Sequence, residues 1–343
     1  MNPSAPGIVA GYLSIDHSVS IAVGIEPGHT ALVDRRLSPD EGRLGGTVTQ
    51  IVFGLAAESN PVEAISWVGP DRAGSQVVAT LDEAGVGTAG INSRHFERTP
   101  RTWLCYAPNG ASYCIYDPGG PLPTALSPAQ SALATAAPWA VITAGPPGPA
   151  SQLLDLLDLA ALLVWSVKAD PISFPPPLVR RLAARAQVIL WSRAETAFLA
   201  NLLGPDWTTQ AAARGALLVE TRGAEGCVHY GRDETTAYRT HRVVSVQDPT
   251  GAGDRFVAGV LSALLRDEPP ATAVRAGISA AGRFLVQRAH EEQLPTQETD
   301  PQSPSGQSRL RDRSETGRAG PRSEAEQCPA SPPPAPAASE GNP

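Results

Sequence analysis

The stretch VVSVQDPTGAGDRFVAGVLSALL, residues 243–265, is the most informative part of the sequence. It begins with β-branched residues typical of a strand and passes through the small residues 251–253. It then continues with Phe256, Val260 and Leu264 at helical spacing. Small residues let the backbone approach a ligand closely and point successive N–H groups outward. Because a helix start also carries a partial positive charge, this strand–loop–helix unit predicts a binding site for an anion.

Outward from this unit, short apolar segments with strand character alternate with helix-like segments. GIVAGYLSI, residues 7–15, predicts a buried first strand, and residues 153–167 predict a buried helix or a helix–strand pair. Further strands are predicted at residues 64–69, 140–145, 188–192, 215–221 and 228–230, and helices at 74–86 and 194–204. Such alternation implies right-handed crossovers and a mainly parallel sheet covered by helices on both faces. We therefore expect an α/β/α domain whose ligands bind beyond the carboxyl ends of the strands.

Two regions, residues 17–40 and 97–117, break the alternation. Asn109-Gly110 lies between two β-rich segments and predicts a hairpin, because both turn residues tolerate positive φ. The earlier region is also extended in character, with a turn at Pro27-Gly28. Together they predict a small sheet, which would form a lid in an enzyme, or else an edge extension of the main sheet. The sequence leaves both alternatives open.

The composition limits the classes of function. The chain has 343 residues, of which 42% are hydrophobic, and a formal net charge of −7. This charge argues against nucleic acid as a partner, and no apolar run approaches the roughly 18 residues of a membrane span. The four cysteines form no CxxC pair and no signal peptide is recognised, so we expect reduced thiols in a cytoplasmic protein.

The last part of the chain differs in character from the rest. Residues 299–343 are rich in Pro, Ser and Glu and contain almost no aliphatic side chains. Such a segment cannot bury enough apolar area to offset its ordering entropy. We expect one domain over residues 1–298 and a disordered tail over 299–343.

Asp254 follows the small residues of the loop and is the candidate catalytic group. Its carboxylate can take a proton from a hydroxyl group aimed at a bound phosphate. The loop lacks the third glycine of a dinucleotide fingerprint and the chain has no GK[ST] sequence, so neither a Rossmann site nor a P-loop is supported. The alternative is a tight strand–helix turn in which Asp254 is only a favourable charge at a helix start.

The same segment resembles the signature of the ribokinase/PfkB carbohydrate kinase family, usually DTTGAGDxF followed by a glycine. The matching residues are Asp248, Thr250, Gly251, Ala252, Gly253, Asp254, Phe256 and Gly259. Further landmarks follow in family order: Gly11 and Asp16 in AGYLSID, Gly45-Gly46 in RLGGTVTQIVFGLA, VGPDRAGSQVVATLDEAGV, ETRGAEGCVHY and QRAHEEQLPT. The similarity covers about residues 7–298 and implies a ribokinase-like fold with a small β lid.

The resemblance implies a role for each matching position. Asp254 would be the catalytic base, and the amides of Gly251, Ala252 and Gly253 would form the anion hole. The ATP phosphates and ribose would contact Thr221, Gly223 and Gly226, with Ser279 near adenine. A sugar, polyol or nucleoside hydroxyl would be held by Asp16, Gly45, Gly46 and Gln50, and Mg²⁺ by Glu195. Activation by a monovalent cation and a homodimer formed through the lid are further features that the resemblance implies.

Several positions depart from the family pattern. Ser192 replaces the Asn of an NxxE motif, Gln50 stands where Asn is common, Pro249 removes a backbone N–H, and Arg255 replaces Ser. Arg255 either reaches an anionic ligand or is a solvent-facing helix charge. None of these departures removes the base or the anion loop, but those at Gln50, Ser192 and Pro249 motivate a second hypothesis, a catalytically weakened binding or regulatory protein with the kinase fold. Burial of Asp254 in a salt bridge, or an anion loop on the opposite rim from residues 16 and 221–226, would argue against the catalytic interpretation.

Overall fold

The computed structural model describes residues 5–240 and 246–293. One compact unit comprises Met1–Pro295, and all elements below belong to it. The predicted tail at 299–343 lies outside the described residues, as does most of the strand predicted at the start of residues 243–265. Within the described part, no helix is long and apolar enough to cross a membrane.

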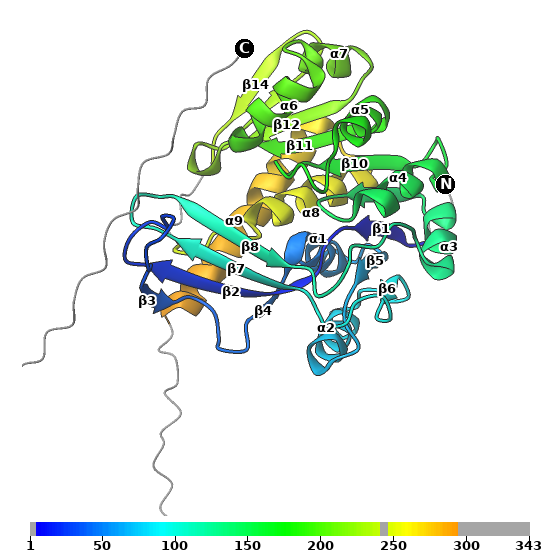
Figure 1. The fold of residues 1–343 in the computed structure, drawn as a ribbon. Coiled ribbons are helices and arrows are strands. Elements are labelled where there is room, and N and C mark those ends of the chain that lie inside the picture. Colours follow the sequence, from blue (N-terminus) through cyan, green and yellow to red (C-terminus); the bar gives the residue numbers. More distant parts are fainter. Residues whose placement is uncertain (1–4, 241–245, 294–343) are drawn as a thin grey trace, which may run out of the picture. The chain divides into compact units, whose positions relative to one another are not determined.

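A nine-stranded sheet forms the centre of the unit (Figure 1). Its strands, in spatial order, are β14 (Thr235–Tyr238), β13 (Cys227–Tyr230), β12 (Leu217–Thr221), β11 (Val188–Ser192), β10 (Leu162–Ser166), β9 (Trp139–Ile142), β1 (Gly7–Ala10), β5 (Val62–Trp67) and β6 (Ile91–Asn92). The pairs from β12 to β6 are parallel, and β13 and β14 are antiparallel additions at one edge. The carboxyl ends of β1, β9, β10, β11 and β12 therefore meet along one edge of the sheet.

Helices cover both faces of this sheet. They are α1 (Gly46–Ala57), α2 (Arg72–Glu83), α3 (Pro128–Ala136), α4 (Pro147–Leu156), α5 (Pro176–Arg185), α6 (Thr196–Leu203), α7 (Trp207–Ala213), α8 (Ala252–Leu265) and α9 (Pro270–Gln293), with short turns η1 (Arg193–Glu195) and η2 (Gly223–Glu225). One core cluster joins α3 to α7 to one face, and a second joins α1, α2, α8 and α9 to the other. Consecutive residues such as Ile8 and Val9 enter opposite clusters, because side chains alternate across a strand. The expected α/β/α architecture is confirmed.

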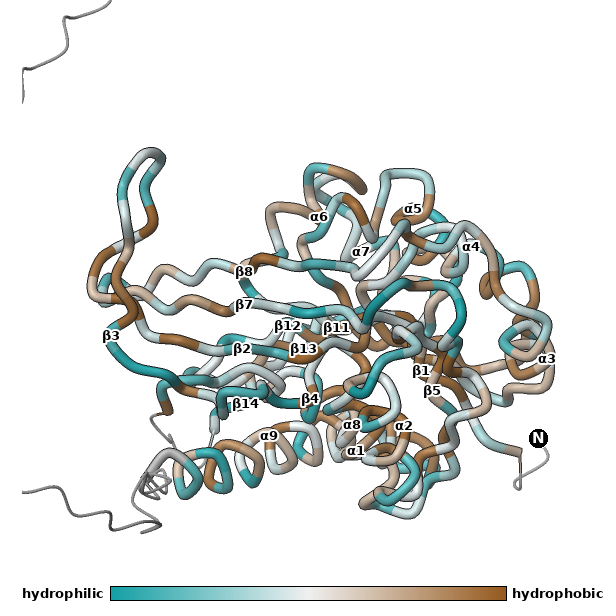
Figure 2. Tube along the Cα trace, turned by 60° about the horizontal axis from the view of Figure 1, so that its bottom comes forward, coloured by the Kyte–Doolittle hydropathy of each residue, from teal (hydrophilic) through white to brown (hydrophobic). Residues whose placement is uncertain are grey.

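The central strands are apolar on both faces, as a covered parallel sheet requires. All of β1 and β9 is buried, and Figure 2 shows the hydrophobic course of β1 and β5 through the body of the unit. The predicted helix–strand pair at residues 153–167 is confirmed, because α4 ends at Leu156 and β10 follows.

A second sheet of five strands extends from this body (Figures 1 and 2). Its order is β3 (Val33–Arg36), β2 (Ser14–Ile21), β7 (Arg101–Tyr106) and β8 (Ser112–Asp117), and β4 (Arg43–Gly45) also pairs with β2. Ala107 and Ala111 close the β7–β8 hairpin by a backbone hydrogen bond, and Gly110 in its turn has φ of 82°. The Asn109-Gly110 signal thus marks a real hairpin.

The single first strand predicted over residues 7–15 is wrong. β1 ends at Ala10 in the main sheet, and β2 begins at Ser14 in the second sheet. The chain changes sheets at Gly11, where a Cβ would lie 2.7 Å from the carbonyl oxygen of Ala144. A glycine lets two backbones approach closely, so a continuous apolar run divides between two sheets.

Candidate active site

The predicted anion loop forms the start of α8. Gly251 is the residue before the helix and has φ of 94°, a left-handed conformation that glycine adopts without steric cost. The amides of Gly251 and Gly253 make no hydrogen bond within the described residues and are available to a ligand. The amide of Ala252 instead donates to the carbonyl oxygen of Pro249 at 3.1 Å. Among the described residues, two of the three predicted anion-hole amides therefore donate no hydrogen bond to the protein.

Asp254 lies in the first turn of α8 and is buried, with 8% of its side chain exposed. Its Oδ1 atom has no hydrogen-bond partner in the described part of the chain. Lys168 forms an ion pair with Asp254, and its Nζ lies 3.5 Å from that oxygen. A charge-assisted hydrogen bond is normally about 2.7–2.9 Å long, so this contact is a long ion pair. Burial of Asp254 beside a cation is the condition set above as an argument against the catalytic interpretation, and this contact meets that condition, although the ion pair is long.

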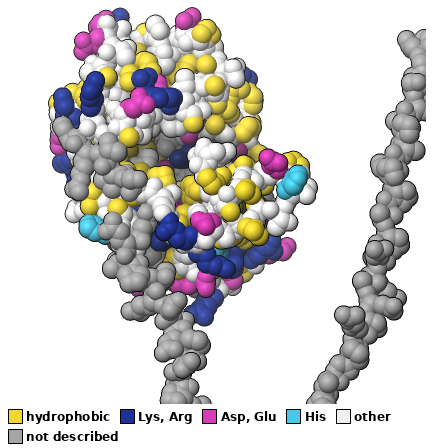
Figure 3. All heavy atoms as spheres, turned by 90° about the vertical axis from the view of Figure 1, so that its left-hand side faces the viewer, with side chains coloured by type: hydrophobic (Ala, Val, Ile, Leu, Met, Phe, Trp, Pro, Cys, Tyr) yellow, Lys and Arg dark blue, Asp and Glu magenta, His cyan; other side chains and the backbone are white. Residues whose placement is uncertain are grey.

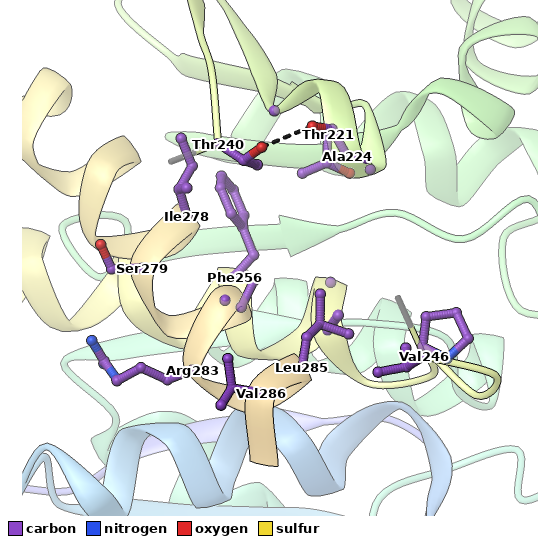
Figure 4. Close-up of a pocket in the computed structure, with 17 residues that line it drawn as sticks. Thr221, Ala224, Thr240, Val246, Phe256, Ile278, Ser279, Arg283, Leu285 and Val286 are labelled. Atoms are coloured by element: carbon purple, nitrogen blue, oxygen red, sulfur yellow. Dashed lines mark hydrogen bonds between the residues drawn. The ribbon is translucent and has the colours of Figure 1, made fainter. Parts of the chain in front are cut away.

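A cavity of about 650 Å³ opens beside this loop. All four residues predicted to bind the nucleotide line this cavity, namely Thr221, Gly223, Gly226 and Ser279. Ala252 and Gly253 of the loop line it as well. Figure 4 shows Phe256 and the apolar residues Ile278, Leu285 and Val286 facing this space, with Thr240 bonded to the carbonyl oxygen of Ala224 at 2.8 Å on its other side. A largely apolar cavity with a few polar groups suits a planar base. The hydroxyl of Ser279 donates within its own helix, to the carbonyl oxygen of Arg275.

Asp16 lies on β2 next to the two glycines of the GG motif. Its carboxylate accepts hydrogen bonds from the Ser14 hydroxyl at 2.5 Å and from the Gly46 amide at 3.3 Å. Burial raises the pKa of Asp16, and these hydrogen bonds oppose the rise only in part. Gly46 has φ of 83°, and a Cβ there would lie 2.4 Å from the carbonyl oxygen of Tyr12. The GG motif therefore fits closely around a partly buried carboxylate.

Gln50 does not point freely into the site. Its Oε1 accepts a hydrogen bond from Nε of Arg255 at 3.0 Å, and the Arg255 guanidinium stacks over the Phe284 ring at 5.6 Å. The side chain of Arg255 therefore points neither into solvent nor toward the anion loop, because Gln50 and Phe284 hold it. It connects α1, α8 and α9 behind the anion loop.

Glu195 is the carboxylate predicted to serve a metal ion. It is buried, and its Oε2 accepts a hydrogen bond from the Ser192 amide, so it caps the turn that follows β11. Burial raises the pKa of Glu195, although the charge of Lys168 opposes that rise. Among the described residues, no group of three or more His, Cys, Asp or Glu side chains is arranged to hold a metal ion.

Two site residues were missed by sequence reasoning. Tyr106, on β7 of the second sheet, donates its hydroxyl to Asp248 at 2.8 Å and lies 2.5 Å from the Thr250 hydroxyl. Burial and the charge of Asp248 raise the pKa of Tyr106. Nothing near Tyr106 in sequence points to this contact. Lys168 had one signal, because it is the only lysine among 343 residues.

These features define a class of protein. The mainly parallel sheet, the second sheet over its carboxyl edge and the anion loop at a helix start are those of a ribokinase-like fold. The structure superposes on a ribokinase from Cryptococcus neoformans solved with ADP, with a TM-score of 0.65, 20% identity, and 81% of this chain and 93% of that chain covered. It also superposes on a Burkholderia thailandensis nucleoside kinase solved with inosine, with a TM-score of 0.66, 19% identity, and 83% and 91% covered.

The family follows from the sequence comparison. The model of the pfkB family carbohydrate kinases matches residues 41–296, and the chain belongs to that family. A probable chloroplastic fructokinase of Arabidopsis thaliana is 41% identical over 90 residues, which are 24% of this chain and 23% of that protein. The chain thus matches only about a quarter of the length of the curated relatives.

Proposed function

We propose that this protein transfers the γ-phosphoryl group of ATP to a hydroxyl of a small sugar, polyol or nucleoside. Asp254 is the base that orients the acceptor hydroxyl and receives its proton. The amides of Gly251 and Gly253 bind the phosphoryl oxygens, while that of Ala252 becomes available only if its bond to Pro249 opens. In this reaction the bond between Pγ and the bridging oxygen of ATP breaks as the bond from Pγ to the acceptor oxygen forms.

One observation carries this proposal: the anion loop, the nucleotide candidates and Asp254 converge at one end of the sheet. The same cavity is lined by Thr221, Gly226 and Gly253, and Asp254 follows in the next position of α8. On the other side, Asp16 is close enough to Asp248 of the loop to be affected by its charge. A phosphate donor and a hydroxylated acceptor can therefore meet at the start of α8.

The residues also fit a magnesium ion brought by the nucleotide. Mg²⁺ in such sites is commonly held by one or two carboxylates together with substrate phosphates. Glu195 meets this requirement as the protein carboxylate, and it lies within range of the charge of Asp254 at the start of α8. Bound Mg²⁺ would neutralise phosphate charge. No cage of protein ligands is needed for that role.

The Lys168 contact favours a second candidate, a binding or regulatory protein that has kept the fold. The carboxylate of Asp254 is buried beside a cation, and the side chain of Gln50 accepts a hydrogen bond from Arg255. In a loose phosphoryl-transfer transition state, however, the proton leaves late and the base mainly orients the hydroxyl. We therefore keep the kinase as the first candidate.

The acceptor is proposed only as a class. The ribokinase and nucleoside kinase of similar fold point to ribose-containing acceptors, and the fructokinase match points to fructose. All these acceptors carry two neighbouring hydroxyl groups, and the carboxylate of Asp16 can accept a hydrogen bond from each of them. A carboxylate left unpaired by a ligand without those hydroxyls would disfavour its binding.

The test is the substitution Asp254→Asn, measured with ATP and a panel of fructose, ribose and inosine. We expect the fold and ATP binding to be kept and turnover to fall by about 10²–10⁴-fold, the usual contribution of a positioned base. Asp206→Asn is the matched control, since Asp206 is an exposed aspartate at the start of α7 with no capping hydrogen bond. Unchanged turnover in Asp254→Asn would refute the mechanism. A panel that supports no ATP consumption, while one compound raises the melting temperature, would favour the binding protein.

We also propose a homodimer through the second sheet. Trp103 and Ile115 face each other across β7 and β8, and both are exposed, as are Val33 on β3 and the nearby Leu32. Figure 3 shows hydrophobic side chains among charged ones on the side that carries this sheet. Exposed apolar side chains that gather on one face of a protein mark interaction surfaces. Ile115→Glu should lower the molar mass measured by light scattering if this sheet is the interface.

A further inference from the structure

The most informative unassigned group is Lys168, in the loop after β10. The chain has 27 basic Lys and Arg residues, and Lys168 is the only lysine among them. In a sequence that otherwise uses arginine, this position holds the compact ammonium group instead. Lysine acts as a point charge on a flexible stem, whereas arginine presents a broad planar fork. A narrow site that must meet a single phosphate oxygen would favour lysine.

The position of Lys168 places its charge at the candidate reaction centre. It follows β10 by two residues, on the edge of the sheet where β11 also ends, at Ser192, ahead of Glu195. Its Nζ lies 3.5 Å from Oδ1 of Asp254. The side chain of Lys168 is 36% exposed, while that of Asp254 is 8% exposed. The side chain of Lys168 is thus partly exposed, while the carboxylate that its ammonium group faces is buried.

The electrostatic surroundings keep Lys168 charged. The carboxylate of Asp254, and secondarily that of Glu195, raise the pKa of Lys168 against the opposing effect of burial. The ion pair with Asp254 is too long for a good charge-assisted hydrogen bond, so the ammonium group retains donors for another partner. In the described residues, Asp254 Oδ1 likewise has no hydrogen bond.

We propose that Lys168 is a catalytic residue that binds the phosphoryl group in transfer, on the side facing the amides of Gly251 and Gly253. This inference rests on the proposed kinase function. Its ammonium group neutralises charge on the phosphoryl oxygens and keeps its own proton throughout. The acceptor proton goes to Asp254, and ADP leaves with the electrons of the broken Pγ–O bond. The alternative is a structural lysine that only compensates the buried charge of Asp254.

ATP and ADP affinities separate these two roles without requiring an acceptor. If Lys168 contacts the γ-phosphoryl group, Lys168→Met should weaken ATP binding by about tenfold or more and ADP binding by much less, as expected for one charged hydrogen bond. Turnover should fall by about 10²–10³-fold, as for the loss of one transition-state donor. Lys168→Arg should restore more of the ATP affinity than of the turnover, because it restores charge without the compact geometry.

A double substitution removes the remaining ambiguity. Lys168→Met alone leaves Asp254 as an unpaired buried charge, which endangers folding. We therefore compare Asp254→Asn with Asp254→Asn/Lys168→Met by calorimetric titration with ATP and with ADP. A phosphoryl-binding lysine predicts that the double variant loses ATP affinity relative to the single one. Equal ATP affinities would overturn the inference, since a purely structural lysine has no role once Asp254 is neutral.

The outcomes also separate this inference from the function on which it rests. If the wild-type protein binds neither ATP nor ADP, the proposed kinase function fails and the inference fails with it. If the wild type binds ATP and phosphorylates an acceptor while Lys168→Met keeps its preference for ATP over ADP, only the inference fails. A lost preference for ATP supports both.

Discussion

The substitution Gly45→Ala tests how closely the GG motif is fitted to Asp16. Gly45 precedes α1 with φ of −138°, outside the left-handed region, so alanine introduces no backbone strain there. A Cβ at this position would lie 1.9 Å from Oδ2 of Asp16 and 2.0 Å from its Cγ. Because real Cβ contacts are not shorter than 3.0 Å, the carboxylate must move by about 1 Å or more. The hydrogen bonds that the Ser14 hydroxyl and the Gly46 amide donate to the Asp16 carboxylate then break or lengthen.

The expected effect is on acceptor use rather than on folding. A misplacement of about 1 Å costs on the order of 10²-fold in rate, which corresponds to about 2.7 kcal/mol of transition-state stabilisation. We expect kcat/KM for the acceptor to fall by about that factor, while the KM for ATP changes little. The free energy of unfolding should change by less, because the displaced carboxylate gains hydration as it loses hydrogen bonds.

A double-mutant cycle with Asp16→Ala identifies the cause. Asp16→Ala removes the carboxylate atoms that the new Cβ would meet, so Gly45→Ala should cost little more in that background. The assay is coupled ADP production with whichever of fructose, ribose and inosine is accepted. The same cycle measured by urea unfolding requires no substrate. If Gly45→Ala has the same effect with and without the Asp16 carboxylate, steric displacement of Asp16 is not its mechanism.

Three further outcomes are expected. Asp16→Asn should raise the melting temperature at pH 7, because burial raises the pKa of Asp16 and so penalises its charged form. The gain should shrink as the pH falls through the raised pKa. It should be absent below about pH 3, where the aspartate is largely protonated in the folded and the unfolded state, and thermal scans across this range test it. Trp165→Ala should cost about 3–5 kcal/mol in urea unfolding, because Trp165 is fully buried and packs edge-to-face on Phe174 at a centroid distance of 5.7 Å. Asp254→Asn should lower the pKa of Lys168, since the carboxylate is the main cause of its rise; with a single lysine in the chain, ε-labelled lysine gives one resonance for the titration, and an unchanged pKa would contradict the ion pair.

Much of the fold was predictable because its signals are local. A continuous apolar run such as the buried part of β10 indicates a strand covered on both faces, and the small residues 251–253 before a helical pattern indicate an anion loop. These patterns depend on φ preferences and on the period of apolar residues, which neighbours in sequence determine. The boundary between β1 and β2 was not predictable, because the apolar period continues through Gly11 and only packing against Ala144 marks the break.

The amino-acid sequence was sufficient to predict the class of fold, the position of the candidate anion loop and the carboxylate at its end. The side chains that meet this loop became visible only in three dimensions: Lys168 lies beside Asp254, Arg255 donates to Gln50, and Tyr106 donates to Asp248. Main-chain conformation follows from short-range sterics and hydrogen bonding, whereas a pairing between distant side chains depends on how whole strands and helices pack.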